Sequence, residues 1–125
     1  MAKVLIVEDE SLIARMYKKA LDFEGFEVVI ADGGADGIKK AETFKPDLIL
    51  LDIMMPEPNG IEVLEKIKSN ENLKNIIVVV LTNLSGENDA QLALKKGADE
   101  YWVKSEIDVK KLPEKIEQVL AINSS

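Results

Sequence analysis

Side chains that could do chemistry come directly after four short apolar runs of the sequence. They are an acidic triplet (Glu8, Asp9 and Glu10), a further acid (Asp52), a hydroxyl beside an amide (Thr82 and Asn83) and a lysine (Lys104). If the runs are parallel strands of one sheet, these side chains converge at the edge where the carboxyl ends of the strands meet. Clustered carboxylates repel each other by roughly 4 kcal/mol per pair at about 4 Å and an effective dielectric of about 20. The cluster is therefore tolerable only with a cation or with protonation.

The chemistry that suits these residues is phosphoryl transfer. Oxygen ligands without histidine or cysteine fit Mg²⁺, which uses one or two carboxylates and leaves positions for phosphate oxygens. Asp52 is the candidate nucleophile, because an ionised carboxylate can attack a phosphoryl group and form an acyl phosphate. Lys104 and Thr82 are suited to bind the phosphoryl oxygens by charge and by hydrogen bond.

The composition narrows the possible functions. The chain has 125 residues and a net charge of −7, from 23 acids and 16 bases, which argues against nonspecific binding to nucleic acid or anionic lipid. It contains no cysteine and no histidine, which excludes disulfides, thiolate chemistry and an internal phosphohistidine. No apolar run is long enough for a signal peptide core or a membrane span, so we expect a cytoplasmic protein without membrane insertion.

Five short apolar runs alternate with segments of helical period. The runs are Val4–Val7, Val28–Ala31, Leu48–Leu51, Ile76–Leu81 and Tyr101–Val103. Their continuous apolar character predicts strands that are buried on both faces of a parallel sheet. The order is strand then helix, five times, which predicts an α/β domain with helices on both faces and right-handed crossovers.

Helix boundaries follow from apolar spacing and from glycine and proline. The first helix is marked by Leu12, Met16 and Ala20, with Ile13 and Leu21 beside them, and closes at Gly25. The second is marked by Ile38 and Ala41 and ends before Pro46, and the third contains Ile61, Leu64 and Ile67. The fourth contains Ala90, Ala93 and Leu94 and ends at a left-handed Gly97, and the fifth contains Ile116, Val119 and Leu120. Pro113 is either a first-turn residue of the fifth helix or an interruption of it. We expect one domain over residues 1–125, with its core at about 3–122.

The pattern resembles response regulator receiver domains of the CheY-like superfamily. The matching residues are Glu8-Asp9, Asp52 in "DIMMPEPNG", Thr82 after "VVVL" and Lys104 after "DEYWV", in a match from about Lys3 to about Ile122. The resemblance implies a doubly wound (βα)5 flavodoxin-like fold with strand order 2-1-3-4-5. It also implies that Asp52 accepts phosphate from a phosphohistidine of a sensor histidine kinase or phosphotransfer protein.

The resemblance implies roles for the other residues as well. Mg²⁺ is held by Glu8, Asp9, Asp52 and the backbone carbonyl of Met54. Thr82 moves toward the phosphate and Tyr101, the switch aromatic, turns inward. The fourth helix, fifth strand and fifth helix then present a changed surface to a downstream protein partner. We expect a stand-alone receiver that signals by protein contact, without direct DNA binding.

Several positions depart from the family pattern. Glu8 stands where aspartate is common and is one methylene longer, so it can reach a metal through water. Ser105 replaces the proline that usually follows the lysine, and we expect a trans peptide bond there, because a cis bond before a non-proline residue costs about 2.5–4 kcal/mol. Asn83 is larger than the usual small residue and crowds the path of the phosphate donor. Met54 and Leu84 are apolar and should hinder the hydrolytic water, which predicts a long-lived phosphoryl group.

Other interpretations compete with this one. Taken singly, the acids at positions 8–10 suit a helix start, Asp52 suits a turn, and Lys104 suits a solvated surface. A receiver-like binding module that works without phosphorylation is the main alternative. A magnesium-dependent phosphatase lacks its second aspartate, because Met54 stands at that position. A flavodoxin-like carrier lacks its phosphate loop, because Glu8–Glu10 would repel a flavin phosphate.

Overall fold

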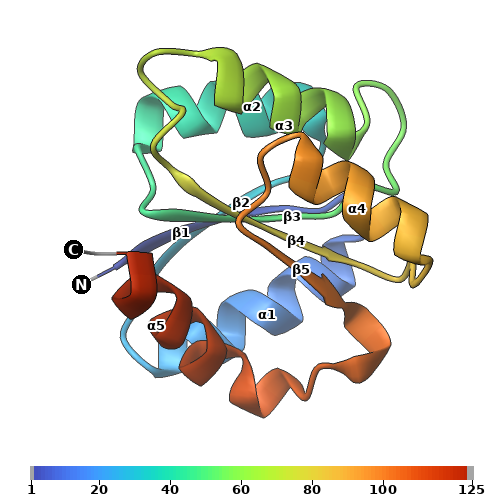
Figure 1. The fold of residues 1–125 in the computed structure, drawn as a ribbon. Coiled ribbons are helices and arrows are strands. Elements are labelled where there is room, and N and C mark those ends of the chain that lie inside the picture. Colours follow the sequence, from blue (N-terminus) through green and yellow to red (C-terminus); the bar gives the residue numbers. More distant parts are fainter. Residues whose placement is uncertain (1, 124–125) are drawn as a thin grey trace.

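The computed structural model describes residues 2–123 and contains one five-stranded parallel sheet, with strand order β2-β1-β3-β4-β5 (Figure 1). The strands are β1 (Lys3–Val7), β2 (Glu27–Ala31), β3 (Leu48–Leu51), β4 (Ile77–Thr82) and β5 (Glu100–Val103). All four neighbouring pairs run parallel. The five predicted strands and their order are therefore confirmed, with boundaries that shift by one residue at most.

Five helices cover the two faces of the sheet. They are α1 (Ser11–Phe23), α2 (Gly34–Phe44), α3 (Gly60–Ser69), α4 (Glu87–Lys95) and α5 (Leu112–Asn123). In Figure 1, α2, α3 and α4 lie above the sheet, and α1 and α5 lie below it. Two short 3₁₀ turns, η1 (Lys104–Glu106) and η2 (Val109–Lys111), connect β5 to α5.

The core consists of two apolar layers, one on each face of the sheet. Successive strand residues point to opposite faces, so Leu5 and Val7 join the layer under α2, α3 and α4, while Val4 and Ile6 join the layer against α1 and α5. Every residue of the central strand, Leu48–Leu51, is buried. Burial on both faces explains why the strands appear in the sequence as continuous apolar runs.

Glycine and proline end the helices where the sequence predicts. Gly25 follows α1 with φ 91°, and Gly97 follows α4 with φ 112°, which are backbone conformations that favour glycine. Helix α2 ends at Phe44, before Pro46. Pro113 is the second residue of α5, and its position in the first turn removes the alternative of an interrupted helix.

The apolar repeat that marks α1 in the sequence is not its buried face. Ala14, Tyr17 and Leu21 are the buried residues of this helix, whereas Leu12 is 75% exposed and Met16 is 48% exposed. The helix carries two apolar rows, and the short connection from β1 determines which row meets the sheet. The small Ala14 is on the buried row, where a methyl side chain lets the helix lie close to the strands. The exposed row is a free apolar surface on α1.

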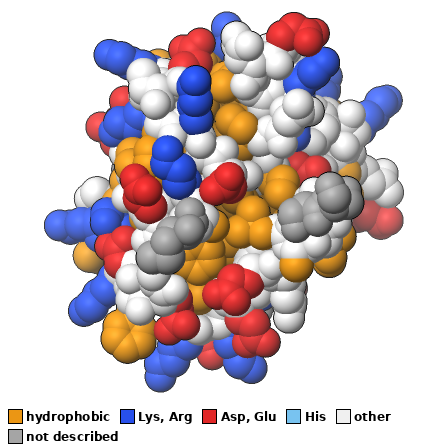
Figure 2. Space-filling model, turned by 90° about the vertical axis from the view of Figure 1, so that its left-hand side faces the viewer, with side chains coloured by type: hydrophobic (Ala, Val, Ile, Leu, Met, Phe, Trp, Pro, Cys, Tyr) orange, Lys and Arg blue, Asp and Glu red, His pale blue; other side chains and the backbone are white. Residues whose placement is uncertain are grey.

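Both ends of the described chain lie at the amino ends of the strands. Figure 2 views this face and shows apolar side chains in its middle, between acidic and basic ones. A hollow at this end is lined by Ala2, Phe26 and Leu120, with Glu24 and Glu117 beside them. Among residues 2–123, no helix has the length and apolar character needed to span a membrane.

Candidate functional site

Strand pairing brings Glu8 and Asp52 together at the carboxyl ends of β1 and β3. Val7 is paired with Leu51, so the next residue on each strand is an acid. The N–H of Asp52 donates to the Val7 carbonyl at 3.1 Å, and the N–H of Glu8 donates to the Ala31 carbonyl at 3.1 Å. Glu8 is only 2% exposed and Asp52 only 5%, so the backbone holds both acids rigidly in a buried position.

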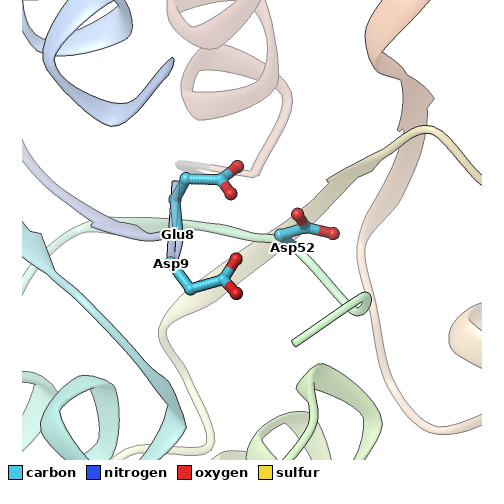
Figure 3. Close-up of side chains that lie close together, drawn as sticks. All are labelled: Glu8, Asp9 and Asp52. Carbon is cyan, nitrogen blue, oxygen red and sulfur yellow. The ribbon is translucent and has the colours of Figure 1, made fainter. Parts of the chain in front are cut away.

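Glu8, Asp9 and Asp52 form one acidic cluster. One carboxylate oxygen from each residue lies within 4.8 Å of the others, and Asp9 is the exposed member. Figure 3 shows Asp9 and Glu8 side by side at the end of β1, with Asp52 across from them at the end of β3. Three carboxylates with one side open to solvent are a donor set that fits a hard divalent cation such as Mg²⁺.

Lys104 provides the positive charge that the cluster needs. Its Nζ donates to Glu8 Oε1 at 2.6 Å and to Asp52 Oδ2 at 2.9 Å. The pairing of Thr82 with Val103 places the lysine one residue beyond the end of β5, and its side chain is only 9% exposed. Lys104 is therefore not a solvated surface lysine, and the sequence correctly predicts that it converges on the acids.

The pKa values of Lys104 and Glu8 reflect this buried network. Burial lowers the pKa of Lys104, but the hydrogen bonds and charges of Glu8 and Asp52 outweigh that effect and raise it to about 12. Burial raises the pKa of Glu8, and the hydrogen bond from Lys104 only partly opposes the rise. Lys104 is thus held in its charged form. Burial makes the negative charge of Glu8 unfavourable in free energy, and a second cation beside it would reduce that cost.

The loop after β3 fixes the second oxygen of Asp52. The N–H of Met54 donates to Asp52 Oδ1 at 2.9 Å, so the carboxylate is held from both sides. Asn59 ends this loop and caps α3 through reciprocal hydrogen bonds with Glu62. At Gly60, any Cβ would collide with the carbonyl oxygen of Asp52 and with the Cα of Ile53. Only glycine lets the start of α3 pack directly on the backbone that carries the acid.

Thr82 and Tyr101 lie on the opposite side of the site, on β4 and β5. Thr82 is fully buried, and its hydroxyl oxygen accepts from the N–H of Leu84 at 3.5 Å. Tyr101 is half-buried against the layer under α2, α3 and α4, and its hydroxyl donates to the Leu84 carbonyl at 2.7 Å. Burial raises the pKa of Tyr101, with smaller contributions from Asp89 and Asp52. The ring of Tyr101 therefore packs inward, and its hydroxyl is tied to the loop before α4.

The neighbouring Trp102 packs on the other face of β5. It is 8% exposed, and Lys115 Nζ lies 4.8 Å from the centre of its ring. We expected at least one of these two aromatic residues to face inward. The structure packs both of them, because helices cover both faces of the sheet.

The structure shows where the residues that depart from the family pattern lie. Among residues 2–123 the one cis peptide bond is Glu57–Pro58, so the bond before Ser105 is trans as expected. Asn83 is exposed, which is compatible with crowding at the mouth of the site. Met54 is 53% exposed beside Asp52, and Leu84 is half-buried.

Tyr17 is a residue near the site that the sequence prediction missed. It comes from the buried face of α1 and is 5% exposed. Burial raises the pKa of its phenol, which also responds to the charges of Lys104, Glu8 and Asp52. The signal that could have found it is the spacing of Ala14, Tyr17 and Leu21, which defines the inner face of the helix.

Comparisons with known proteins agree with this geometry. A family model described as the response regulator receiver domain matches residues 4–117. The chain is 40% identical over 102 residues to the alkaline phosphatase synthesis transcriptional regulatory protein PhoP of Bacillus subtilis, covering 82% of this chain and 42% of that protein. It is 38% identical over 120 residues to the response regulator ArlR of Staphylococcus saprophyticus, covering 96% of this chain and 53% of that protein. The chain thus spans about half the length of the curated relatives it matches.

Solved receiver structures match nearly the whole chain. A CheY-like receiver domain protein from Methanospirillum hungatei superposes with a TM-score of 0.89 at 32% identity, over 98% of this chain and 96% of that one. The receiver domain of Francisella response regulator 1452 gives a TM-score of 0.89 at 25% identity, over 99% of this chain and 100% of that one.

The fold and the site together define a doubly wound α/β signalling module with an acidic pocket at the strand ends. The chain belongs to the response regulator receiver domain family. It is a receiver of two-component signalling and not a classical enzyme.

Proposed function

We propose that Asp52 is the phosphoacceptor of this receiver and that Mg²⁺ is its cofactor. The observation that carries the proposal is the position of Asp52, whose carboxylate lies between the Lys104 amine and the Met54 N–H and within the acidic cluster. A buried acid at this point would be a liability in a merely structural role. It is instead ionisable, rigid at its base and open toward Asp9, which is exposed.

The chemical step is an attack of an Asp52 oxygen on a phosphoryl group. The new O–P bond forms while the P–N bond of a phosphohistidine breaks, and the electron pair leaves with the imidazole nitrogen. No general base is needed, because the carboxylate has no proton to lose. Lys104 is within reach of Asp52 Oδ2 and supplies positive charge to the phosphoryl oxygens, and Thr82 supplies a hydroxyl donor.

Glu8, Asp9 and Asp52 would hold the metal, with the backbone carbonyl of Met54 as a further ligand. When bound, Mg²⁺ offsets the negative charge on the phosphoryl oxygens. Lys104 now contacts two of these carboxylates. The lysine and a metal therefore share the same acids, and we expect the Glu8–Lys104 contact to loosen as the metal binds.

The signal would leave the site through Thr82 and Tyr101. Thr82 and Leu84 are joined by a hydrogen bond, and Leu84 is joined to Tyr101 by another, so movement of Thr82 reaches the loop before α4. The α4-β5-α5 face would present the change to a downstream protein. The switch is a shift between two arrangements of this face.

Membership of the family implies a cognate histidine kinase as the source of the phosphoryl group. The free apolar row of α1 begins with Leu12, four residues after Glu8, which is a suitable position for docking a donor protein. We propose that the chain acts as one receiver domain in the cytoplasm, without direct DNA binding by this domain.

Acetyl phosphate with Mg²⁺, followed by intact mass measurement, tests the proposal. A single phosphate adduct that is absent in Asp52→Asn and in EDTA would support both the acceptor and the metal. No adduct, together with no stabilisation by Mg²⁺, would overturn the proposal. No adduct despite tight Mg²⁺ binding would show that Asn83 blocks small donors, and a kinase would then be used in the same experiment.

A receiver-like module that binds without phosphorylation is the second candidate. It is favoured by one observation, the exposed Asn83 that follows Thr82, which would crowd the path of a phosphate donor. A partner that binds wild-type protein and Asp52→Asn with equal affinity would select this candidate.

A further inference from the structure

Met54 has an unusual combination of exposure and position. Its side chain is 53% exposed, while its own N–H is bonded to Asp52 Oδ1 at 2.9 Å. The next residue, Met55, is only 8% exposed and belongs to the core. Met54 therefore exposes its thioether to solvent, while its backbone is hydrogen-bonded to the Asp52 carboxylate.

The chain leaves few other targets for an oxidant. It contains no cysteine, so the most reactive sulfur groups toward peroxides are those of its four methionines. Met16 is exposed to a similar degree, at 48%, but it lies on the solvent side of α1. Of these two exposed methionines, only Met54 has its backbone bonded to a residue of the site.

We propose that Met54 is an oxidation site through which a hydroperoxide shortens the life of the phosphoryl group on Asp52. The inference rests on the proposed phosphorylation of Asp52. In the reaction, the sulfur takes one oxygen atom from the peroxide as the O–O bond breaks. The sulfur is oxidised by two electrons, and hydrogen peroxide is reduced to water.

The consequence follows from the change in polarity beside the acyl phosphate. A thioether is apolar and excludes water, whereas a sulfoxide is a polar hydrogen-bond acceptor. We expect the apolar Met54 side chain to hinder water beside Asp52, whereas a sulfoxide oxygen can hold a water molecule there. Water attack on phosphorus is therefore faster in the oxidised protein, and the active state ends sooner.

The experiment compares decay of the phosphate adduct before and after hydrogen peroxide treatment. The proteins are wild type, Met54→Leu and Met16→Leu, where leucine keeps the volume and cannot be oxidised. Peptide mass mapping identifies the oxidised residues, and intact mass follows the adduct after the donor and peroxide are removed. We expect a several-fold faster decay after oxidation in wild type and in Met16→Leu, and no change in Met54→Leu.

Each outcome decides a different statement. No adduct in the untreated protein, from acetyl phosphate or from a kinase, together with no stabilisation by Mg²⁺, would overturn the proposed function. Two outcomes would overturn only the oxidation proposal. In the first, oxidation of Met54 leaves the lifetime of the adduct unchanged; in the second, Met54 stays reduced while Met16 is oxidised. Met54→Gln provides a polar side chain without oxidation and should shorten the adduct lifetime in untreated protein.

Discussion

Lys104 and Asp52 are 52 residues apart in the sequence, and their side chains are joined by a hydrogen bond of 2.9 Å. The same amine contacts Glu8 at 2.6 Å, so one cation serves two buried acids. This contact offsets part of the repulsion between the two acids. It also places a positive charge beside the carboxylate that is proposed to accept phosphate.

Replacing Lys104 by methionine should destabilise the fold. Removal of one partner of a buried ion pair leaves uncompensated charge and costs about 3–5 kcal/mol. Urea unfolding of the variant should show this loss, and Mg²⁺ should restore more stability to the variant than to wild type, because it replaces the missing cation. Lys111→Met, at an exposed lysine, is the matched control and should change little. Equal stability of Lys104→Met and wild type would contradict the ion-pair assignment.

The stabilising effect of Lys104 should depend on alkaline pH. Its pKa is raised from 10.5 to about 12, so the folded state holds the proton more tightly than the unfolded state. The contribution is therefore complete below 10.5 and is lost as the pH rises through about 12. The measurement is the difference in unfolding free energy between wild type and Lys104→Met at several pH values. A difference that stays constant across this window would be inconsistent with the raised pKa.

Gly60→Ala should distort the site, whereas Gly33→Ala should not. A Cβ at Gly60 would meet the backbone of Asp52 and Ile53, which cannot move aside as a flexible side chain would. We expect a loss of about 1–3 kcal/mol in unfolding free energy, and slower phosphorylation. Gly33 has open space around its Cβ position and an extended φ of −177°, so it serves as the control. Unchanged stability of both variants would show that α3 can shift without cost.

Tyr101→Phe should loosen the loop between β4 and α4. The change removes the 2.7 Å hydrogen bond to the Leu84 carbonyl but keeps the ring. The net loss should be about 0.5–1.5 kcal/mol, and amide hydrogen exchange of Leu84 and its neighbours should rise. If exchange in this loop is unchanged, the Tyr101 hydroxyl does not hold the loop. The hydrogen bond from Tyr101 to Leu84 would then play no part in the proposed transmission from Thr82 to α4.

Much of the fold and of the site could be predicted from the sequence. Continuous apolar runs such as Leu48–Leu51 identify strands that are buried on two sides, and their alternation with helices allows few topologies. Asp52, Lys104 and Thr82 each stand immediately after such a run. Their convergence follows from the rule that parallel strands end at a common edge.

The tertiary structure decided what spacing alone leaves open. Helix α1 has two apolar rows, and only packing shows that Ala14, Tyr17 and Leu21 face the core while Leu12 is exposed. Helical spacing of apolar residues predicts that a helix has an apolar face. Which face packs against the sheet depends on how the chain leaves the preceding strand.

The sequence by itself determined which residues meet at the strand ends, because parallel strands end at a common edge, while the resemblance to receiver domains implied the order of the strands. It did not determine which of them touch. The bridge from Lys104 to Glu8 and the inward position of Tyr101 depend on side-chain reach and on the space between neighbouring elements. Those quantities exist only once the two apolar layers have packed against the sheet.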